Sequence, residues 1–213
     1  MKDCSVIIVD DHPVVREGYR RLIDLQPGLK IAGEAEDARA AYAQFRALRP
    51  DVVVMDVTLP GASGIEAIRH IRQYDDSARI VVFTMHLSAA FALKAVQAGA
   101  MGYITKSSDP RLLVEAIFGA LRGQTVISPD VIEAIARDRI SGIGTGLTDL
   151  SPRQTEILCL LARGWSAERI AGELSISPKT VRNNHYQIKS ILGLETDAQL
   201  VWFALETGLL PAI

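Results

Sequence analysis

Acidic side chains end two apolar runs of the chain. Residues 6–9 (VIIV) are followed by Asp10 and Asp11, and residues 52–55 (VVVM) are followed by Asp56. Carboxylates at the ends of neighbouring buried strands are costly unless a cation or a proton compensates their charge. Oxygen ligands of this kind are what a hard divalent cation such as Mg²⁺ prefers. The spacing therefore predicts a metal-assisted phosphate site.

The elements that must position these acids are short strands alternating with amphipathic helices. The sequence predicts strands at 5–9, 29–33, 51–55, 79–84 and 101–105, and helices at 13–25, 37–48, 64–73, 88–98 and 109–121. Five such repeats predict a doubly wound α/β domain, a five-stranded parallel sheet with helices on both faces. The carboxyl ends of parallel strands meet at one edge. That edge collects Asp10, Asp11, Asp56, Thr84 and Lys106.

The remainder of the chain has a different organisation. We expect the α/β domain at 1–123, a linker with a short helix at 124–147, and a helix-turn-helix domain at 148–213. The linker helix is predicted to begin near Pro129, and the glycine-rich stretch 141–146 marks the boundary. Residues 148–213 carry no strand signal; their helices are predicted at 152–162, 167–174, 178–192 and 197–207.

Composition restricts the class of protein. The chain has 213 residues, 48% hydrophobic and 23% charged, with a net charge of −2. This balance is typical of globular domains and argues against a wholly basic nucleic-acid coat. Cys4 and Cys159 lie far apart, outside any metal-ligand spacing, which predicts free thiols in a reducing compartment. The sequence has neither a signal-peptide core nor a long apolar span, so we expect a cytoplasmic protein without a membrane segment.

Residues 4–123 resemble the receiver domain of two-component response regulators. The matching segments are 8–12 (IVDDH), 54–61 (VMDVTLPG), 82–84 (VFT) and 102–106 (GYITK). The resemblance implies that Asp56 accepts a phosphoryl group from a sensor histidine kinase, without turnover catalysis. An ionised carboxylate needs no general base for this attack. Mg²⁺ and Lys106 would neutralise the charge on the transferred group.

The resemblance also implies metal ligands and a switch. Asp11, Asp56 and the Thr58 carbonyl would bind Mg²⁺, and Asp10 would hold a metal-bound water. Thr84 would turn to the new phosphate, and Tyr103 would fill the space that this movement vacates.

The residues of the predicted phosphate site also have purely structural interpretations. Asp56 could cap the next helix, Lys106 could be a solvated loop residue, and Thr84 and Tyr103 could be ordinary strand formers. Another class with an aspartyl-phosphate is the haloacid-dehalogenase-like hydrolases. That family has a second aspartate two residues after the nucleophile, where this chain has Thr58.

Residues 151–209 resemble the effector domain of the NarL/FixJ (LuxR-type) family. The segments are 150–158 (LSPRQTEIL), 164–166 (GWS), 170–171 (IA), 174–177 (LSIS) and 179–183 (KTVRN). The resemblance implies binding to double-stranded promoter DNA through the helix at 178–192. Arg182, Asn183 and Tyr186 would read bases. Lys179, Thr180 and Lys189 would contact phosphates.

The last helix has a wide apolar face. In the family this helix pairs two effector domains, so we expect a homodimer on phosphorylation. The predicted contact residues are Leu200, Val201, Phe203 and Ala204; packing inside one domain is the alternative.

This chain departs from the family pattern in its charges. His185 lies on or beside the apolar stripe of the recognition helix, where it needs a hydrogen-bond partner. Asp197 takes the place of a common basic residue. Residues 148–213 contain six basic and seven acidic side chains, whereas DNA-binding modules are usually basic. The alternative function is therefore a phospho-acceptor that signals through protein partners with a weakly binding helix-turn-helix.

Overall fold

The computed structural model describes residues 3–141, 147, 149–207 and 209–210. The chain divides into two compact units, Met1–Met85 with Ala95–Asp130, and His86–Lys94 with Val131–Ile213. The expected glycine-rich boundary at 142–146 lies outside the described residues.

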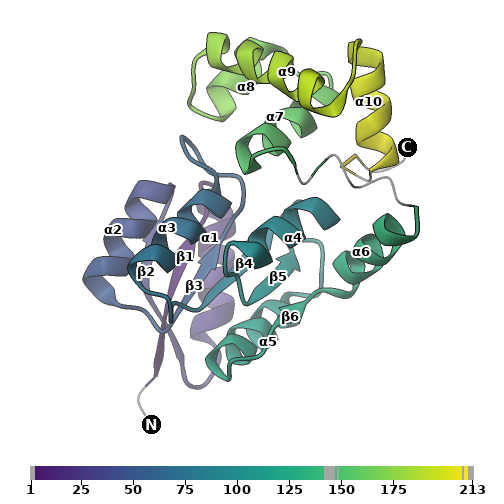
Figure 1. The fold of residues 1–213 in the computed structure, drawn as a ribbon. Helices are drawn as coiled ribbons and strands as arrows, with labels where there is room; N and C mark the ends of the chain where they lie inside the picture. The colour runs from purple at the N-terminus through teal and green to yellow at the C-terminus, as the bar shows by residue number, and fades with distance from the viewer. Residues whose placement is uncertain (1–2, 142–146, 148, 208, 211–213) are drawn as a thin grey trace. The chain divides into compact units, whose positions relative to one another are not determined.

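The N-terminal part of the chain alternates strands and helices as the sequence predicts (Figure 1). The strands are β1 (Cys4–Val9), β2 (Leu29–Ala35), β3 (Val52–Met55), β4 (Ile80–Thr84), β5 (Gly102–Thr105) and β6 (Val126–Ile127). The helices are α1 (Pro13–Asp24), α2 (Ala38–Leu48), α3 (Gly64–Tyr74), α4 (Ala89–Gln97) and α5 (Pro110–Leu121).

All strand pairs are parallel, in the order β2-β1-β3-β4-β5-β6. The expectation of five strands is wrong by one. β6 has only two residues, which pair with Gly102 and Tyr103 and are too few to give a periodic signal. Residues 126 and 127, which were expected in the linker, therefore belong to the sheet.

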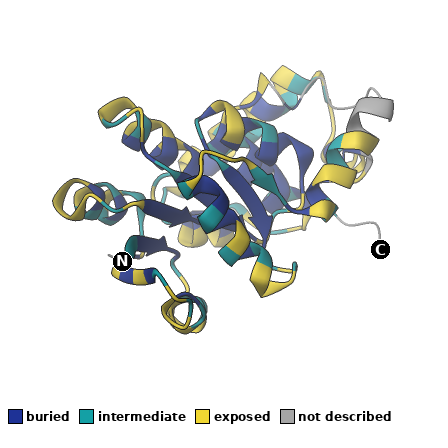
Figure 2. Cartoon of the chain, turned by 90° about the horizontal axis from the view of Figure 1, so that it is seen from below, coloured by how far each residue is buried: buried dark blue, intermediate teal, exposed yellow. Residues whose placement is uncertain are grey.

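The two faces of the sheet are buried under helices. Alternate strand residues point to opposite faces. One face packs against α1 and α5, where the ring of Tyr19 meets the ring of Phe83 edge-on at 4.4 Å. Phe45 of α2 and Ile68 of α3 are also almost fully buried. Buried residues line the strands in Figure 2, and this continuous burial explains their Val- and Ile-rich composition.

The C-terminal part contains helices only, among the residues described. They are α6 (Pro129–Ser141), α7 (Pro152–Ala162), α8 (Ala167–Glu173), α9 (Pro178–Leu192) and α10 (Asp197–Glu206). Hydroxyl side chains cap four of them, at Ser151, Ser166, Ser177 and Thr196. Each accepts a backbone N–H that the first helical turn leaves unpaired. Gly193 ends α9 in the left-handed conformation, at φ +67°.

The helix-turn-helix is formed by α8 and α9. Ile170 of α8 and Val181 and Ile188 of α9 are fully buried. The turn between the helices contains Ser175 with a φ of +51°. This packing leaves one side of α9 exposed, as a recognition helix requires.

Candidate functional site

A buried ionic triad lies at the carboxyl edge of the sheet. Asp10 follows β1, Asp56 follows β3 and Lys106 follows β5, and backbone hydrogen bonds fix this alignment: Asp56 N donates to Val9 O (2.9 Å) and Lys106 N to Thr84 O (2.7 Å). Lys106 Nζ donates to Asp10 Oδ2 at 2.5 Å and to Asp56 Oδ2. The three side chains are only 3%, 6% and 7% exposed for Asp10, Asp56 and Lys106. The predicted convergence of these groups is present in the structure.

The charges of the triad depend on one another. Burial raises the pKa of Asp56 above its usual value, while Lys106 and a hydrogen bond from Thr84 act in the opposite direction. Burial lowers the pKa of Lys106, but the Asp56 and Asp10 carboxylates raise it by more, so the net shift is upward. Lys106 therefore stays protonated, and Asp56 relies on it to remain ionised.

A second group of ligand atoms lies beside the triad. Asp10, Asp11 and His12 carry potential ligand atoms within 4.8 Å of one another. Asp11 Oδ1 is buried and accepts no hydrogen bond, although His12 Nδ1 lies 2.8 Å away. Asp10 Oδ1 accepts the His12 N–H at 2.9 Å. A buried carboxylate oxygen without a donor fits a cation ligand.

Backbone hydrogen bonds of the loop after Asp56 hold its side chain and the start of α3. Thr58 N donates to Asp56 Oδ1 at 3.3 Å. Gly64, the first residue of α3, donates its N–H to Val57 O at 2.7 Å. A Cβ atom at position 64 would lie 1.8 Å from the Asp56 carbonyl oxygen. Only glycine allows α3 to start this close to the Asp56 backbone. Gly64 was not among the residues predicted from the sequence.

The expected switch residues are buried near the triad. Thr84 and Tyr103 both have no exposed surface. Thr84 ends β4, and its hydroxyl contributes a hydrogen bond to Asp56. Tyr103 lies in β5 opposite Val82 of β4. The structure thus places Thr84 at Asp56 and Tyr103 in the buried interior.

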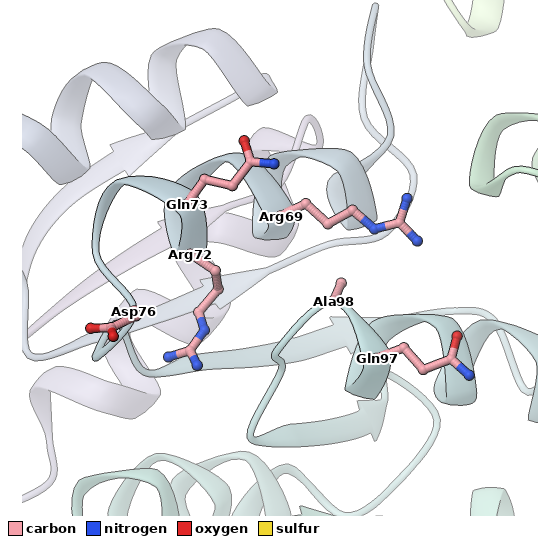
Figure 3. A pocket seen from close by; sticks show the side chains of 6 residues that line it. All are labelled: Arg69, Arg72, Gln73, Asp76, Gln97 and Ala98. Atoms are coloured by element: carbon pink, nitrogen blue, oxygen red, sulfur yellow. The ribbon is translucent and has the colours of Figure 1, made fainter.

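A polar groove of about 390 Å³ lies elsewhere on the α/β domain (Figure 3). The residues that line it are Arg69, Arg72, Gln73, Asp76, Gln97 and Ala98. Most of them come from the C-terminal parts of α3 and α4. Helices in a parallel α/β sheet run opposite to the strands, so this groove is at the other edge from Asp56. The groove is therefore separate from the triad of Asp10, Asp56 and Lys106.

The recognition helix presents most of the predicted DNA contacts to solvent. Lys179, Thr180, Arg182, Asn183 and Tyr186 are exposed on α9. Tyr186 has 76% of its surface exposed, the largest fraction for an aromatic residue on this helix. Thr180 N donates to Ser177 Oγ at 3.0 Å and so takes part in the helix cap. The N-terminal turn of α9 and the exposed side chains that follow it therefore lie on a side of the helix that is accessible to solvent.

Acidic neighbours contact three basic or polar residues of α9. Arg182 Nη1 lies 3.0 Å from Glu168 Oε1 of α8. Lys189 Nζ and His185 Nε2 each lie 2.9 Å from Asp197 Oδ1 of α10. Asp197 is thus the partner that half-buried His185 requires, and Val181 and Ile188 keep their expected inward direction.

The expectation for the last helix needs correction at two positions. Leu200 and Ala204 have 1% and 0% exposed surface, because they pack in the core of the helical domain. They cannot meet a second copy without unfolding. Val201 and Phe203 are half-buried, whereas Trp202 is 63% and Leu205 37% exposed. Because α10 is mostly apolar, the periodicity of its hydrophobic residues could not distinguish the buried side of the helix from the exposed side.

An acidic pocket with a paired lysine, on a doubly wound sheet, together with a helix-turn-helix, defines a phosphorylation-controlled DNA-binding regulator. Comparison with known protein families supports this class. Residues 6–118 match the family described as response regulator receiver domain, and residues 148–204 match bacterial regulatory proteins, luxR family. No described helix combines the length and apolarity needed to cross a membrane.

Relatives and solved structures extend over most of the chain. The response regulator UvrY of Escherichia coli K12 is 34% identical over 210 residues, covering 98% of this chain and 96% of UvrY. A LuxR-family two-component response regulator from Aurantimonas sp. SI85-9A1 is 57% identical, with a TM-score of 0.63, over 65% of this chain and 99% of that structure. RcsB of Salmonella enterica serovar Typhimurium, solved on promoter DNA with the phosphomimetic BeF3⁻, is 28% identical with a TM-score of 0.69 and covers 96% of this chain and 99% of that structure.

The chain belongs to the response regulators with a LuxR-type DNA-binding domain. Its output is a DNA-binding domain that regulates transcription, and it is not a turnover enzyme.

Proposed function

We propose that Asp56 is the residue that accepts the phosphoryl group in this response regulator. The observation that carries the proposal is the buried triad: one carboxylate at a strand end, held by an ammonium group that also binds a second carboxylate. A helix-capping role would not require Lys106 to be buried between two acids. The haloacid-dehalogenase alternative requires a second aspartate two residues after the nucleophile, and this chain has Thr58 at that position. Thr58 contributes only its backbone N–H to Asp56.

The transfer follows from these residues. A carboxylate oxygen of Asp56 attacks the phosphorus atom of a phosphohistidine on a sensor kinase. The new O–P bond forms as the P–N bond breaks, and the electron pair leaves with the imidazole nitrogen. Lys106 Nζ, within hydrogen-bond reach of Asp56, neutralises charge on the phosphoryl oxygens.

The neighbouring acids fit a divalent cation. Asp11 Oδ1 is buried without a hydrogen-bond donor, and Asp10 Oδ1 lies close to it on the same turn. Asp11, Asp56 and the Thr58 carbonyl would hold Mg²⁺, and Asp10 would hold one of its waters. When bound, the cation supplies charge stabilisation to the phosphoryl oxygens.

Thr84 and Tyr103 would carry the signal away from the acceptor. The Thr84 hydroxyl already bonds Asp56, so a phosphoryl group on Asp56 offers it a new and stronger acceptor. Tyr103 lies on the adjoining strand, where a shift of Thr84 changes the space around its ring. A local charge change would thus become a packing change.

The effector domain would bind promoter DNA as a homodimer. Arg182, Asn183 and Tyr186 are exposed on α9 for base contacts. Lys179 and Thr180, which are exposed, and the half-buried Lys189 would contact phosphates. RcsB, which shares this fold, is bound to promoter DNA in its solved structure. For dimerisation we retain Val201 and Phe203 and add Trp202 and Leu205, the exposed apolar side chains of α10.

Labelling with acetyl phosphate and magnesium tests the acceptor. Asp56→Asn should abolish phosphoryl uptake and leave the circular dichroism spectrum unchanged, whereas Asp76→Asn, an exposed carboxylate, should label as the wild type does. Uptake by the Asp56→Asn protein would refute the assignment. Asp11→Asn should keep the acceptor but demand far more magnesium, because a ligand is lost.

A gel-shift measurement tests the output. The phosphorylated protein should give a sequence-selective shift with promoter fragments at low salt, stronger than that of the unphosphorylated protein. The acidic balance of residues 148–213 favours the alternative, signalling through protein partners. Normal labelling of Asp56 with no selective shift would support that alternative and contradict DNA-binding output.

A further inference from the structure

The basic residues of the recognition helix are held by acids of neighbouring helices. Glu168 of α8 binds Arg182, and Asp197 of α10 binds both Lys189 and His185. Glu168 is 14 positions from Arg182, and Asp197 is 8 positions from Lys189 and 12 from His185. The contacts therefore connect different helices and do not arise from the spacing within one helix. Because a carboxylate only accepts, His185 Nε2 donates to Asp197.

Both acids sit where a negative charge is stabilised. Glu168 lies in the first turn of α8, and Asp197 is the first residue of α10, after the Thr196 capping box. Helix N-termini favour carboxylates through their unpaired N–H groups and dipole. Backbone hydrogen bonding and then Arg182 lower the pKa of Glu168, and the bond from Lys189 lowers the pKa of Asp197. The acids therefore stay ionised beside α9.

Two of the four other basic residues of the domain are engaged as well. Arg153 binds the buried Glu156 at 2.8 Å, and Arg169 stacks over Trp165 with its guanidinium carbon 3.6 Å from the ring centre. Lys179, at the first turn of α9, has no side-chain partner within the part of the chain that the structure describes. A DNA phosphate can thus meet Lys179 directly, but must displace a carboxylate to reach Arg182 or Lys189.

We propose that Glu168 and Asp197 act as internal competitors of DNA, each occupying basic side chains of α9 that would otherwise bind phosphates or bases, and so determine how tightly the regulator binds. This inference rests on the proposed use of α9 in DNA binding. The competition explains how a domain with one more acid than base can still be selective. Non-specific contacts, which depend on charge alone, are weakened, whereas a cognate site adds base contacts that release Arg182 from Glu168.

The first test compares matched charge removals in the full-length protein, phosphorylated with acetyl phosphate and magnesium. Glu168→Gln and Asp197→Asn should each raise affinity for a mixed-sequence duplex at low salt by about 5- to 10-fold, in line with the strong electrostatic share of such binding. Glu173→Gln and Glu195→Gln remove the same charge from exposed positions that, among the described residues, form no ion pair with Arg182 or Lys189, and they should change affinity by less than about 2-fold. Equal effects of all four variants would overturn the proposal, and so would weaker binding by Glu168→Gln, which would make Glu168 a positioning residue.

A double-mutant cycle isolates the contact. In an Arg182→Ala background, Glu168→Gln should have no more effect than Glu173→Gln, because the competed side chain is gone. A full effect of Glu168→Gln without Arg182 would contradict the mechanism.

A measurement without DNA separates this proposal from the function it builds on. Carboxyl-detected NMR should show a pKa of Glu168 below that of an ordinary glutamate, and Arg182→Ala should bring this pKa back toward the usual value. Unchanged titration in Arg182→Ala would refute the pairing itself. Normal pairing, combined with α9 variants that do not alter DNA binding, would instead contradict the proposed recognition helix and overturn the competition.

Discussion

Replacing Gly64 by alanine should disable the acceptor while leaving the fold recognisable. The added Cβ would lie 1.8 Å from the Asp56 carbonyl oxygen, short of the 3.4 Å at which ordinary contact begins, so α3 and the Asp56 backbone must separate by about 1.6 Å. The same Cβ would also approach Val57 Cα to 2.9 Å. Both obstacles are backbone atoms, which no rotamer change can move aside.

From this displacement we estimate the loss of stability and the loss of phosphorylation rate. Overpacking of a close-packed site costs about 1–3 kcal/mol. A domain of this size loses about 4 °C of melting temperature per kcal/mol, so the expected loss is about 4–12 °C. A shift of about 1 Å in a reacting group costs on the order of 100-fold in rate, so phosphoryl uptake should slow by at least that factor.

The assay is the initial rate of labelling by acetyl phosphate, measured on a phosphate-affinity gel below the melting temperature of both proteins. Gly18→Ala is the matched control, because position 18 has no atom within 4 Å of the new Cβ and lies within α1. That change should leave labelling intact and raise stability by about 0.5–1 kcal/mol, as alanine is the better helix former. Wild-type labelling and melting of Gly64→Ala would refute the argument from close approach.

Three further outcomes are expected. Burial raises the pKa of Asp56, so without divalent cations stability should fall as pH rises from about 3.8 through the native pKa; Asp56→Asn should melt higher at neutral pH, with the gain shrinking toward acid, and an equal gain at all pH values would contradict this. Arg153→Ala leaves the Glu156 carboxylate buried without its guanidinium and should cost the helical domain about 3–5 kcal/mol in urea unfolding, followed by the fluorescence of the two tryptophans; Arg163→Ala is the control, and equal losses would argue against the pair. Burial raises the pKa of the Cys159 thiol to about 12, so in a Cys4→Ser protein a thiol reagent should react at least about 100-fold faster after unfolding than before, and fast native labelling would refute the burial.

The pocket around Asp56 was predictable because residues that follow the strands of one parallel sheet must lie together at one edge of that sheet. Asp10 and Lys106 are 96 residues apart, yet both follow strands of one parallel sheet, whose ends must meet at one edge. Strand signals were strong because these strands are buried on both faces. The residues that fill the pocket could therefore be named from the sequence.

Other features depend on contacts that no periodicity encodes. β6 is too short to produce a pattern, and its pairing depends on the neighbouring β5. Gly64 matters only because of the backbone it approaches. The pairing of Glu168 with Arg182 depends on the crossing of α8 and α9, which sequence spacing does not give. For the same reason Leu200 and Ala204 looked like surface contacts although they belong to the core.

The wide separation of Asp10 and Lys106 has a consequence for the newly made chain. Synthesis proceeds from the N-terminus, so both carboxylates are made long before the lysine that binds them. Until β5 joins β4, the acids have no ammonium partner and the sheet edge repels itself. A fragment that stops before residue 106 therefore carries the acceptor side chain without its pocket. The pocket around Asp56 is therefore complete only when the chain has folded as far as β5.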